Sequence, residues 1–285
     1  MKPNFLIIGA SKCATTSISN LLAQHPEIFV ISKETRFFSE DQIFAKGTDW
    51  YESLYKDGEA YKARGDRNNL YTMKEVFPDT VERIFAYNPD FKLIYCVRNP
   101  IHRIESYWLQ IRSHGGEDVH YDFNEAVHLN REWLVDASNY WQQINAFRKY
   151  FSDDQIMIVF YEDFRKSNQG VLKECYKFLE VDPHFSFSQE QIHLNPSAGK
   201  KIPSSALSKL RQYPLLRTGA KIIPPSIRKP LKQKLFFKSS TGKPTWKPET
   251  LEWALKEISE DTNKFLEFYG KSDRFWDLKA VDVLK

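Results

Sequence analysis

The sequence has few cysteines, no long hydrophobic run and one long stretch without acidic residues. Its three cysteines, Cys13, Cys96 and Cys175, are scattered through 285 residues with neither a disulfide pattern nor a metal-ligand spacing. The longest apolar run, residues 93–97, is far shorter than the roughly 20 residues that a membrane-spanning helix needs. Because the first predicted strand begins at residue 5, no room is left for a signal peptide. We therefore expect a cytoplasmic protein from a reducing compartment.

The acidic residues are absent from one block. Residues 191–248 contain no Asp or Glu and 13 Lys and Arg, whereas the rest of the chain holds 28 basic and 37 acidic residues. Such a block usually contacts an anionic partner, although a solvated basic face is the alternative. We expect residues 190–247 to form a basic lid or acceptor-side segment. Peripheral contact of residues 200–235 with an anionic membrane surface remains open, and we expect no nucleic-acid partner.

Short apolar runs alternate with amphipathic stretches along the chain. The runs at 5–8, 28–31, 61–64, 93–97 and 155–161 predict strands, and residues 73–87 carry the apolar spacing of a helix. No internal repeat or low-complexity tract is visible. Strands that alternate with helices favour a central, mostly parallel sheet flanked by helices, an α/β architecture of three layers. We predict a single domain that covers residues 1–285.

The first strand leads into a predicted anion site. Gly9 ends the strand, Lys12 lies three residues later, and Thr15, Thr16 and Ser17 open an amphipathic helix. Free backbone N–H groups and the positive end of the helix dipole then point at one spot, and Lys12 adds a full charge. A phosphate or a sulfate is the simplest ligand. The alternative is a helix capped by Thr15 or Ser17 beside a solvated lysine.

A second basic motif follows the apolar run at residues 93–97. Arg98 stands at the predicted strand end, and Pro100 suits the first turn of the next helix. Arg103 and Ser106 then lie near the start of that helix. An arginine at such a strand end suits a phosphate, because its planar fork of N–H donors matches phosphate oxygens.

These two motifs together resemble the sulfotransferases that use 3′-phosphoadenosine 5′-phosphosulfate (PAPS). Lys12-x-x-Thr15-Thr16-Ser17 after a strand resembles their 5′-phosphosulfate loop, although many members have Gly where this chain has Ala14. Arg98-x-Pro100, followed by Arg103-x-x-Ser106, resembles their 3′-phosphate site. The resemblance implies a P-loop-type fold without a metal, with PAPS as donor and 3′-phosphoadenosine 5′-phosphate (PAP) as product. Its donor-binding residues would be Ser11, Lys12, Cys13, Ala14, Thr15, Thr16, Ser17, Arg98 and Ser106.

The same resemblance implies a catalytic carboxylate. Glu34, in Lys33-Glu34-Thr35-Arg36-Phe37-Phe38, takes the position of the catalytic glutamate of carbohydrate-type members. A carboxylate beside an acceptor hydroxyl removes its proton as the oxygen attacks sulfur. Burial against the two phenylalanines would raise the pKa of Glu34, whereas a nearby Lys33 or Lys12 would lower it. The alternative is an ordinary surface glutamate.

Two weaker matches complete the predicted site. The segment Asp66-Arg67-Asn68-Asn69-Leu70-Tyr71 resembles a family stretch that often contains Thr or Ser and then Pro, so Asn68 and Asn69 depart from the pattern. Arg67 and Tyr71 are candidate substrate-binding residues. Near the C-terminus, Lys238, Gly242 and Lys243 resemble the late loop that closes over the donor nucleotide.

We therefore predict transfer of a sulfuryl group from PAPS to a hydroxyl, or an amine, by in-line displacement. Glu34 would act as the base, and Lys12 would stabilise the departing phosphate oxygen. The expected acceptor is a saccharide, a glycolipid or a small molecule. Two alternatives stay open: a nucleotide kinase that uses Asp163 for magnesium, and a non-catalytic binder of an anionic polymer or membrane surface.

Overall fold

The central layer of the protein is a parallel sheet. The computed structural model describes residues 2–113, 119–186, 201–203, 237–239 and 244–284. Within these residues the sheet has the strand order β2-β3-β1-β4-β5, and every neighbouring pair is parallel. This confirms the predicted α/β architecture. The strands are β1 (Phe5–Gly9), β2 (Ile28–Val30), β3 (Ala63–Arg67), β4 (Lys92–Val97) and β5 (Ile156–Phe160).

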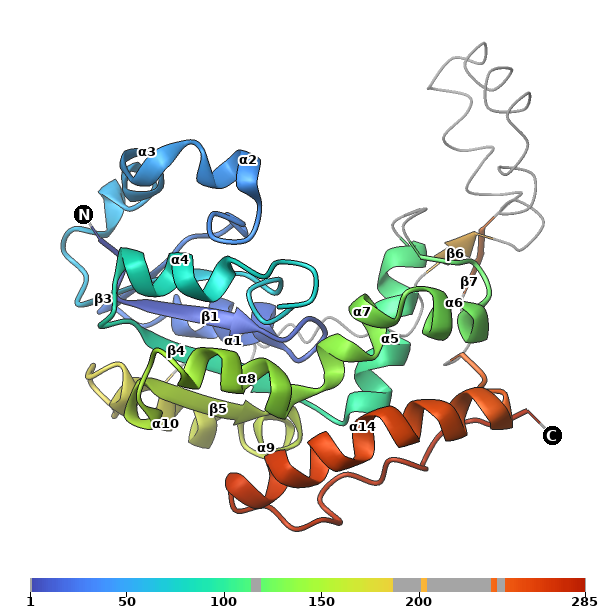
Figure 1. Cartoon of the computed structure of the whole chain (residues 1–285). Helices are drawn as coiled ribbons and strands as arrows, with labels where there is room; N and C mark the ends of the chain where they lie inside the picture. The colour runs from blue at the N-terminus through green and yellow to red at the C-terminus, as the bar shows by residue number, and fades with distance from the viewer. Residues whose placement is uncertain (1, 114–118, 187–200, 204–236, 240–243, 285) are drawn as a thin grey trace.

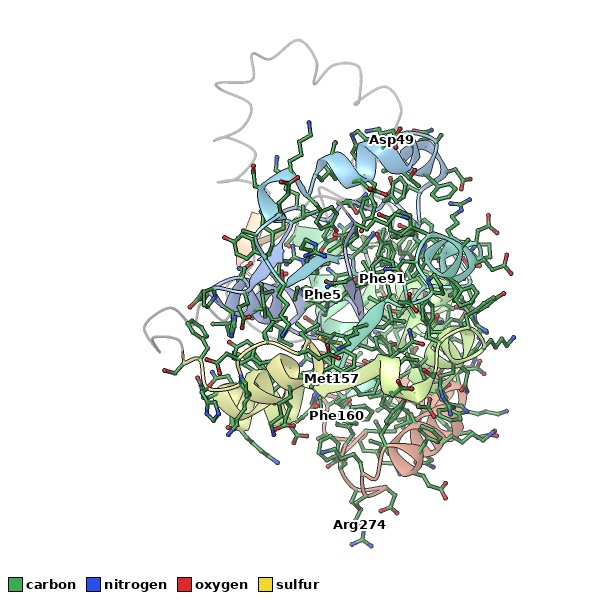
Figure 2. The ribbon with its side chains drawn as sticks, turned by 90° about the vertical axis from the view of Figure 1, so that its left-hand side faces the viewer. Phe5, Asp49, Phe91, Met157, Phe160 and Arg274 are labelled. Atoms are coloured by element: carbon green, nitrogen blue, oxygen red, sulfur yellow. The ribbon has the colours of Figure 1, made fainter. Side chains whose placement is uncertain are left out.

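Helices cover both faces of this sheet. α1 and α10 lie on one face, and α4 and α8 lie on the other (Figures 1 and 2). The helices are α1 (Thr15–Leu22), α2 (Asp41–Phe44), α3 (Gly47–Ser53), α4 (Thr80–Tyr87), α5 (Pro100–Ser113), α6 (Phe123–Leu129), α7 (Arg131–Leu134), α8 (Tyr140–Arg148), α9 (Tyr161–Lys166), α10 (Asn168–Phe178) and α14 (Pro248–Phe268). Single 3₁₀ turns are η1 (Lys56–Gly58), η2 (Asp136–Ser138) and η3 (Asp153–Gln155). A separate antiparallel pair joins β6 (Lys201–Pro203) to β7 (Phe237–Ser239).

All five predicted strands of the central sheet are present, but two element boundaries were wrong. The third strand begins at Ala63 rather than at residue 61 and continues to Arg67, so Asp66 lies inside the sheet. The helix expected over 73–87 begins only at Thr80. Pro78 explains this late start, because proline disfavours helical backbone in the residue before it.

The core follows from the pattern of apolar residues. Both outer layers pack on β1 and β4, whose apolar side chains are buried on both faces of the sheet. Such continuous burial is typical of parallel strands between two helical layers. A second cluster joins α5, α6 and α14 around Trp246, whose indole N–H donates to Glu105 at 3.1 Å. This cluster packs along α5 from Ile101 to Leu109.

A buried carboxyl anchors the segment that follows β2. Asp66 is fully buried in β3, and its Oδ2 accepts hydrogen bonds from the hydroxyls of Thr35, Tyr71 (3.1 Å) and Tyr51 (3.3 Å). Burial raises the pKa of Asp66 to about 6, although these hydrogen bonds oppose the rise. Because Thr35 directly follows Glu34, the Asp66 carboxyl fixes the backbone beside the predicted catalytic glutamate.

Removing this anchor should destabilise the fold. Asp66→Ala leaves three hydroxyls without their acceptor, and we expect the free energy of unfolding to fall by about 2–4 kcal/mol in urea denaturation. Asp66→Asn tests the sign of the pH dependence. Since the folded pKa of about 6 exceeds the ordinary 3.8, folding takes up protons between these values.

The stability of the wild type relative to Asp66→Asn should therefore increase as the pH falls from 7 towards 4. Asp153→Asn is a control whose pH dependence should have the opposite sign. The bond from Arg148 lowers the pKa of the Asp153 carboxyl, so the stability that Asp153 contributes should decrease as the pH falls. An advantage of Asp66 over Asn that grows with rising pH would contradict this account.

Candidate active site

Four strands of the sheet end at the predicted site. Lys12 follows β1, Glu34 follows β2, Asn69 follows β3 and Arg98 follows β4. Because the strands are parallel, their carboxyl ends lie at one edge of the sheet. β1 lies between β3 and β4, where the chain order changes direction along the sheet. Crevices at such a reversal are the usual ligand sites of open α/β sheets.

The loop after β1 has the backbone of an anion site. Gly9 has φ +141°, and a Cβ there would clash with Thr72. Lys12 and Ala14 have φ values of 73° and 65°, in the left-handed region, where a residue other than glycine costs roughly 1–2 kcal/mol. Left-handed residues turn successive N–H groups towards one concavity. The φ value of Ala14 also explains why glycine suits this position in the resemblance.

No side chain of the described residues caps the N-terminus of α1. Ala14 is the N-cap residue, so the predicted alternative of a cap by Thr15 or Ser17 is wrong. The Thr15 hydroxyl instead donates to Asn69 Oδ1 at 2.6 Å. The N–H groups of the first turn lack acceptors within the helix and are left for an anion.

Two cations are placed at this loop. The Lys12 ammonium donates to Gln110 on α5. Arg98 donates from Nη1 to the carbonyl of Lys12 at 3.2 Å, and its guanidinium lies 4.7 Å from the centre of the Tyr161 ring. The Nε of Arg98 is buried and has no hydrogen-bond partner among the described residues. The structure thus brings together two motifs that are 86 residues apart in sequence.

Glu34 lies beside the same loop. Its Oε1 accepts a hydrogen bond from Asn69 Nδ2 at 2.6 Å and lies 3.7 Å from Arg67 Nε. Burial raises the pKa of Glu34, as predicted, while Arg67 and Arg36 oppose the rise. The prediction that Lys33 or Lys12 supplies the opposing charge was wrong. A half-buried carboxylate with a raised pKa suits proton abstraction near neutral pH.

The other predicted residues differ in what their side chains contact. The Cys13 thiol lies in the core, 3.8 Å from the Tyr140 hydroxyl, and burial raises its pKa to about 11. Ser11 and Ser106 are buried, whereas Thr16 and Ser17 are partly exposed. The Tyr71 ring is fully buried and its hydroxyl donates to Asp66. Any role of Tyr71 towards a substrate would therefore be exerted through Asp66.

Part of the prediction lies outside the described residues. Gly242 and Lys243 are among them, and so is most of the 190–247 segment. Lys238 belongs to β7, of which the structure describes the backbone alone.

Three residues at the site were missed by the sequence analysis. Asn69 contacts both Thr15 and Glu34, Gln110 accepts from Lys12, and the Tyr161 ring packs against Arg98. Asn69 lies two residues after the end of β3 but well beyond the strand predicted at 61–64, so the sequence did not place it at the sheet edge. No local pattern indicates its two partners either.

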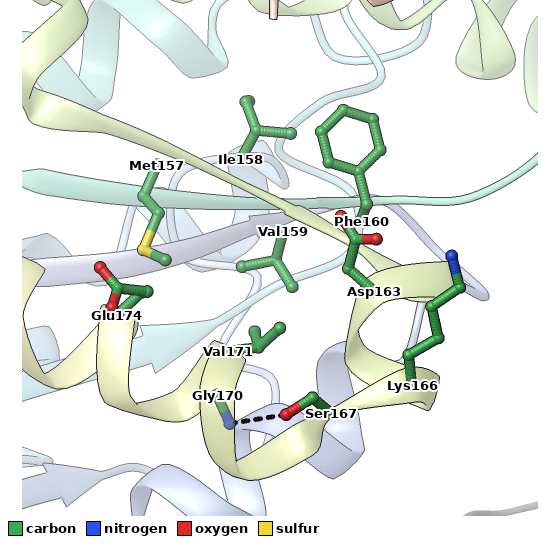
Figure 3. Close-up of a pocket in the computed structure, with 10 residues that line it drawn as sticks. All are labelled: Met157, Ile158, Val159, Phe160, Asp163, Lys166, Ser167, Gly170, Val171 and Glu174. Atoms are coloured by element: carbon green, nitrogen blue, oxygen red, sulfur yellow. Dashed lines mark hydrogen bonds between the residues drawn. The ribbon is translucent and has the colours of Figure 1, made fainter. Parts of the chain in front are cut away.

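The kinase alternative depends on Asp163. This residue lines a cavity of about 360 Å³ between β5, α9 and α10 (Figure 3), and its Oδ2 accepts a hydrogen bond from Lys271 Nζ at 2.7 Å. Within the described ranges, no group of three His, Cys, Asp or Glu residues is arranged to hold a metal ion. Nothing in these contacts favours a magnesium-dependent kinase.

Among the residues that the structure describes, none of the helices combines the length and apolarity required to cross a membrane.

Comparison with known proteins adds independent support. Heparan sulfate glucosamine 3-O-sulfotransferase 5 of Mus musculus is 28% identical over 207 residues, 69% of this chain and 58% of that protein. The mouse bifunctional heparan sulfate N-deacetylase/N-sulfotransferase 4 is 28% identical over 241 residues, 74% of this chain and 27% of that protein. The chain therefore spans between a quarter and three fifths of the length of these relatives.

Solved structures show the same fold. A sulfotransferase from Alicyclobacillus acidocaldarius matches with a TM-score of 0.65 at 20% identity, covering 95% of this chain and 97% of the other. The sulfotransferase domain of the Synechococcus PCC 7002 olefin synthase matches with a TM-score of 0.52 at 17% identity, covering 95% of both chains. The family model named Sulfotransferase domain matches residues 2–219. With the anion loop, Glu34 and Arg98 at one sheet edge, the chain belongs to the sulfotransferase domain family.

Proposed function

We propose that this protein transfers a sulfuryl group from PAPS to a hydroxyl or amine of a saccharide. The observation that carries the proposal is the position of Glu34, which is joined through Asn69 to Thr15 at the anion loop. A carboxylate and a phosphate-binding loop are thereby held next to each other. The names of the relatives, which specify sulfotransferases that act on heparan sulfate, support a saccharide acceptor.

The residues present fit a donor with phosphates at both ends of a nucleoside. The left-handed loop and the first turn of α1 suit the 5′-phosphosulfate. The buried, unpartnered Nε of Arg98 supports a 3′-phosphate contact, and Ser106 is the proposed second ligand. We also propose donor contacts from Ser11, Thr16 and Ser17, from the backbone of Cys13 and Ala14, and from Lys238, Gly242 and Lys243.

The chemistry divides between two side chains. When bound, PAPS supplies a sulfuryl group whose bond to the 5′-phosphate oxygen breaks as the acceptor oxygen or nitrogen bonds to sulfur. Glu34 takes the acceptor proton, and its raised pKa makes it an effective base. Lys12, with the loop N–H groups, stabilises the charge on the phosphate oxygen that leaves.

Arg67 is the proposed acceptor-side cation. Its side chain is largely buried beside Glu34, and its Nε and Nη1 have no hydrogen-bond partner in the part of the chain that is described. A saccharide hydroxyl or carboxylate would satisfy these donors. We further propose that the chain works as one domain, in which residues 190–247 close the acceptor side.

The donor site is tested by calorimetric titration with PAP in the absence of magnesium. Arg98→Ala should weaken PAP binding about 10–100-fold, the usual loss for a charged hydrogen bond, and leave ADP binding nearly unchanged. Arg165→Ala is a matched control, because Arg165 also lies over the Tyr161 ring but is exposed. Equal affinity of the wild type for PAP and ADP would refute the proposed donor.

The base is tested by sulfate transfer from labelled PAPS to glucosamine-containing saccharides. Glu34→Gln should lower kcat by about 10²–10⁴-fold, and PAP binding should persist. Lys12→Ala should abolish turnover, because the charge on the leaving phosphate oxygen would lose its cation. In the wild type, activity should fall with decreasing pH through the raised pKa of Glu34, above the ordinary value of 4.5.

Glu40→Gln is the control for Glu34, because Glu40 lies six residues further along the same segment and pairs with Arg36 at 2.8 Å. Its turnover should match that of the wild type. Normal activity of Glu34→Gln would show that another group accepts the proton.

A further inference from the structure

Asn69 connects the two halves of the site through both ends of its carboxamide. Thr15 Oγ1 donates to Asn69 Oδ1 at 2.6 Å, and Asn69 Nδ2 donates to Glu34 Oε1 at 2.6 Å. A carboxylate only accepts hydrogen bonds, so the Nδ2 end must face Glu34. The Oδ1 end then faces the Thr15 hydroxyl. This orientation gives every atom of the link a compatible partner.

We propose that Asn69 is a positioning residue that holds the Glu34 carboxylate in its reactive place and ties it to the donor loop. The inference rests on the proposed function, because it assigns a task to a partner of the proposed base. Asn69 stands where this chain departs from the Thr or Ser followed by Pro that the family often has. The link is therefore a property of this chain that the resemblance does not imply.

The geometry around Glu34 shows what Asn69 prevents. Arg67 Nε lies 3.7 Å from the same Oε1 that Asn69 contacts at 2.6 Å, so the amide has the shorter bond and the guanidinium is held beyond hydrogen-bond distance. Without the amide, the Glu34 carboxylate loses this restraint and is free to move. A mobile carboxylate would be aligned with the acceptor for less of the time.

The second carboxylate oxygen is left for the reaction. Among the residues described, no hydrogen bond to Glu34 Oε2 is found, and the side chain retains 25% exposure. Asn69 thus restrains Oε1 while Oε2 faces no competing donor. Such restraint on one oxygen fixes the direction in which the other accepts the acceptor proton.

The link to Thr15 couples this restraint to the donor loop. Thr15 is the first residue of α1, and its hydroxyl has a single proton, which it donates to Asn69. The position of the amide, and with it Glu34, therefore depends on how the first turn of α1 is arranged. If a bound donor phosphate rearranges this turn, the position of the Glu34 carboxylate should change with it.

Asn69 also stabilises the charged form of Glu34. The charged groups that act on this carboxylate are Arg67 from β3 and Arg36 from its own segment, both of which lower its pKa against the effect of burial. The N–H bond from Asn69 favours the same ionised state. Its loss should raise the pKa of Glu34 and move the acid limb of the rate profile to higher pH.

The experiment measures kcat/KM against pH together with PAP binding by calorimetry for four proteins: the wild type, Asn69→Ala, Asn69→Asp and Asn68→Ala. Asn69→Ala should lower kcat about 10–100-fold and shift the acid limb upward by about half a pH unit or more. Asn69→Asp keeps the shape of the side chain but places a like charge beside Glu34, so its shift should reach about one unit or more. PAP affinity should change less than about threefold in both.

Asn68→Ala is the matched control for loop structure. Asn68 is buried next to Asn69, and its side chain bonds to Leu70 N, Ser39 Oγ and Tyr71 rather than to Glu34. This variant should lose stability and keep the wild-type acid limb. The inference fails if Asn69→Asp retains the wild-type turnover and acid limb, or if Asn68→Ala shifts the limb equally. Activity in Glu34→Gln would instead overturn the proposed base, which separates the two failures.

Discussion

The site depends on the burial of β1 between β3 and β4. This strand is apolar throughout and pairs on both sides, so its carboxyl end is fixed at the middle of the sheet edge. The candidate anion-site residues are placed relative to that end. The loop after β1 turns through two left-handed residues into α1, and Arg98 at the end of β4 bonds to the carbonyl of Lys12. The helix dipole and the cations consequently act on one small volume.

Asp66 and Glu34 are two carboxyls near this edge that differ in burial and in hydrogen-bond partners. Asp66 lies inside β3 with three hydroxyl donors, and its pKa rises to about 6 because water is excluded. Glu34 is partly exposed, has an arginine nearby and contacts an amide. The first carboxyl holds the segment through Thr35, and the second is left accessible one residue away. A buried carboxyl with three hydrogen bonds, anchored one residue from Glu34, limits the motion of this segment.

In the proposed mechanism, the link through Asn69 connects the donor loop to the base. In-line transfer requires the base, the acceptor atom and the leaving oxygen to be aligned, and small displacements cost large factors in rate. A hydrogen-bonded connection from the first turn of α1 to the carboxylate keeps these elements in register. Arg67 forms an ion pair with Glu34 at 3.7 Å, beyond hydrogen-bond distance. Burial raises the pKa of Glu34, and the charge of Arg67 opposes this rise.

The sequence by itself determined the strands of the central sheet and their alternation with helices, and it marked the loop after β1 as a candidate anion site. The alternation of apolar and amphipathic stretches located all five strands of the central sheet, and Lys12, Glu34 and Arg98 were each identified from short motifs. These features depend on neighbours in the chain, whose spacing is visible in the sequence. Element boundaries such as the start of α4 were less accurate, because proline and tertiary packing override a weak periodicity.

Only the tertiary structure decided which side chains meet. Asn69 contacts Thr15 across 54 residues and Glu34 across 35, and Lys12 meets Gln110 across 98. The tertiary structure also buries the Cys13 thiol and the Tyr71 ring in the core. It brings the charges of Arg67 and Arg36 close enough to Glu34 to lower its pKa. The physical reason is that hydrogen bonds and pKa values depend on distance and burial. The distances and the burial are set when the parallel strands align their carboxyl ends. The local order of residues does not predict them.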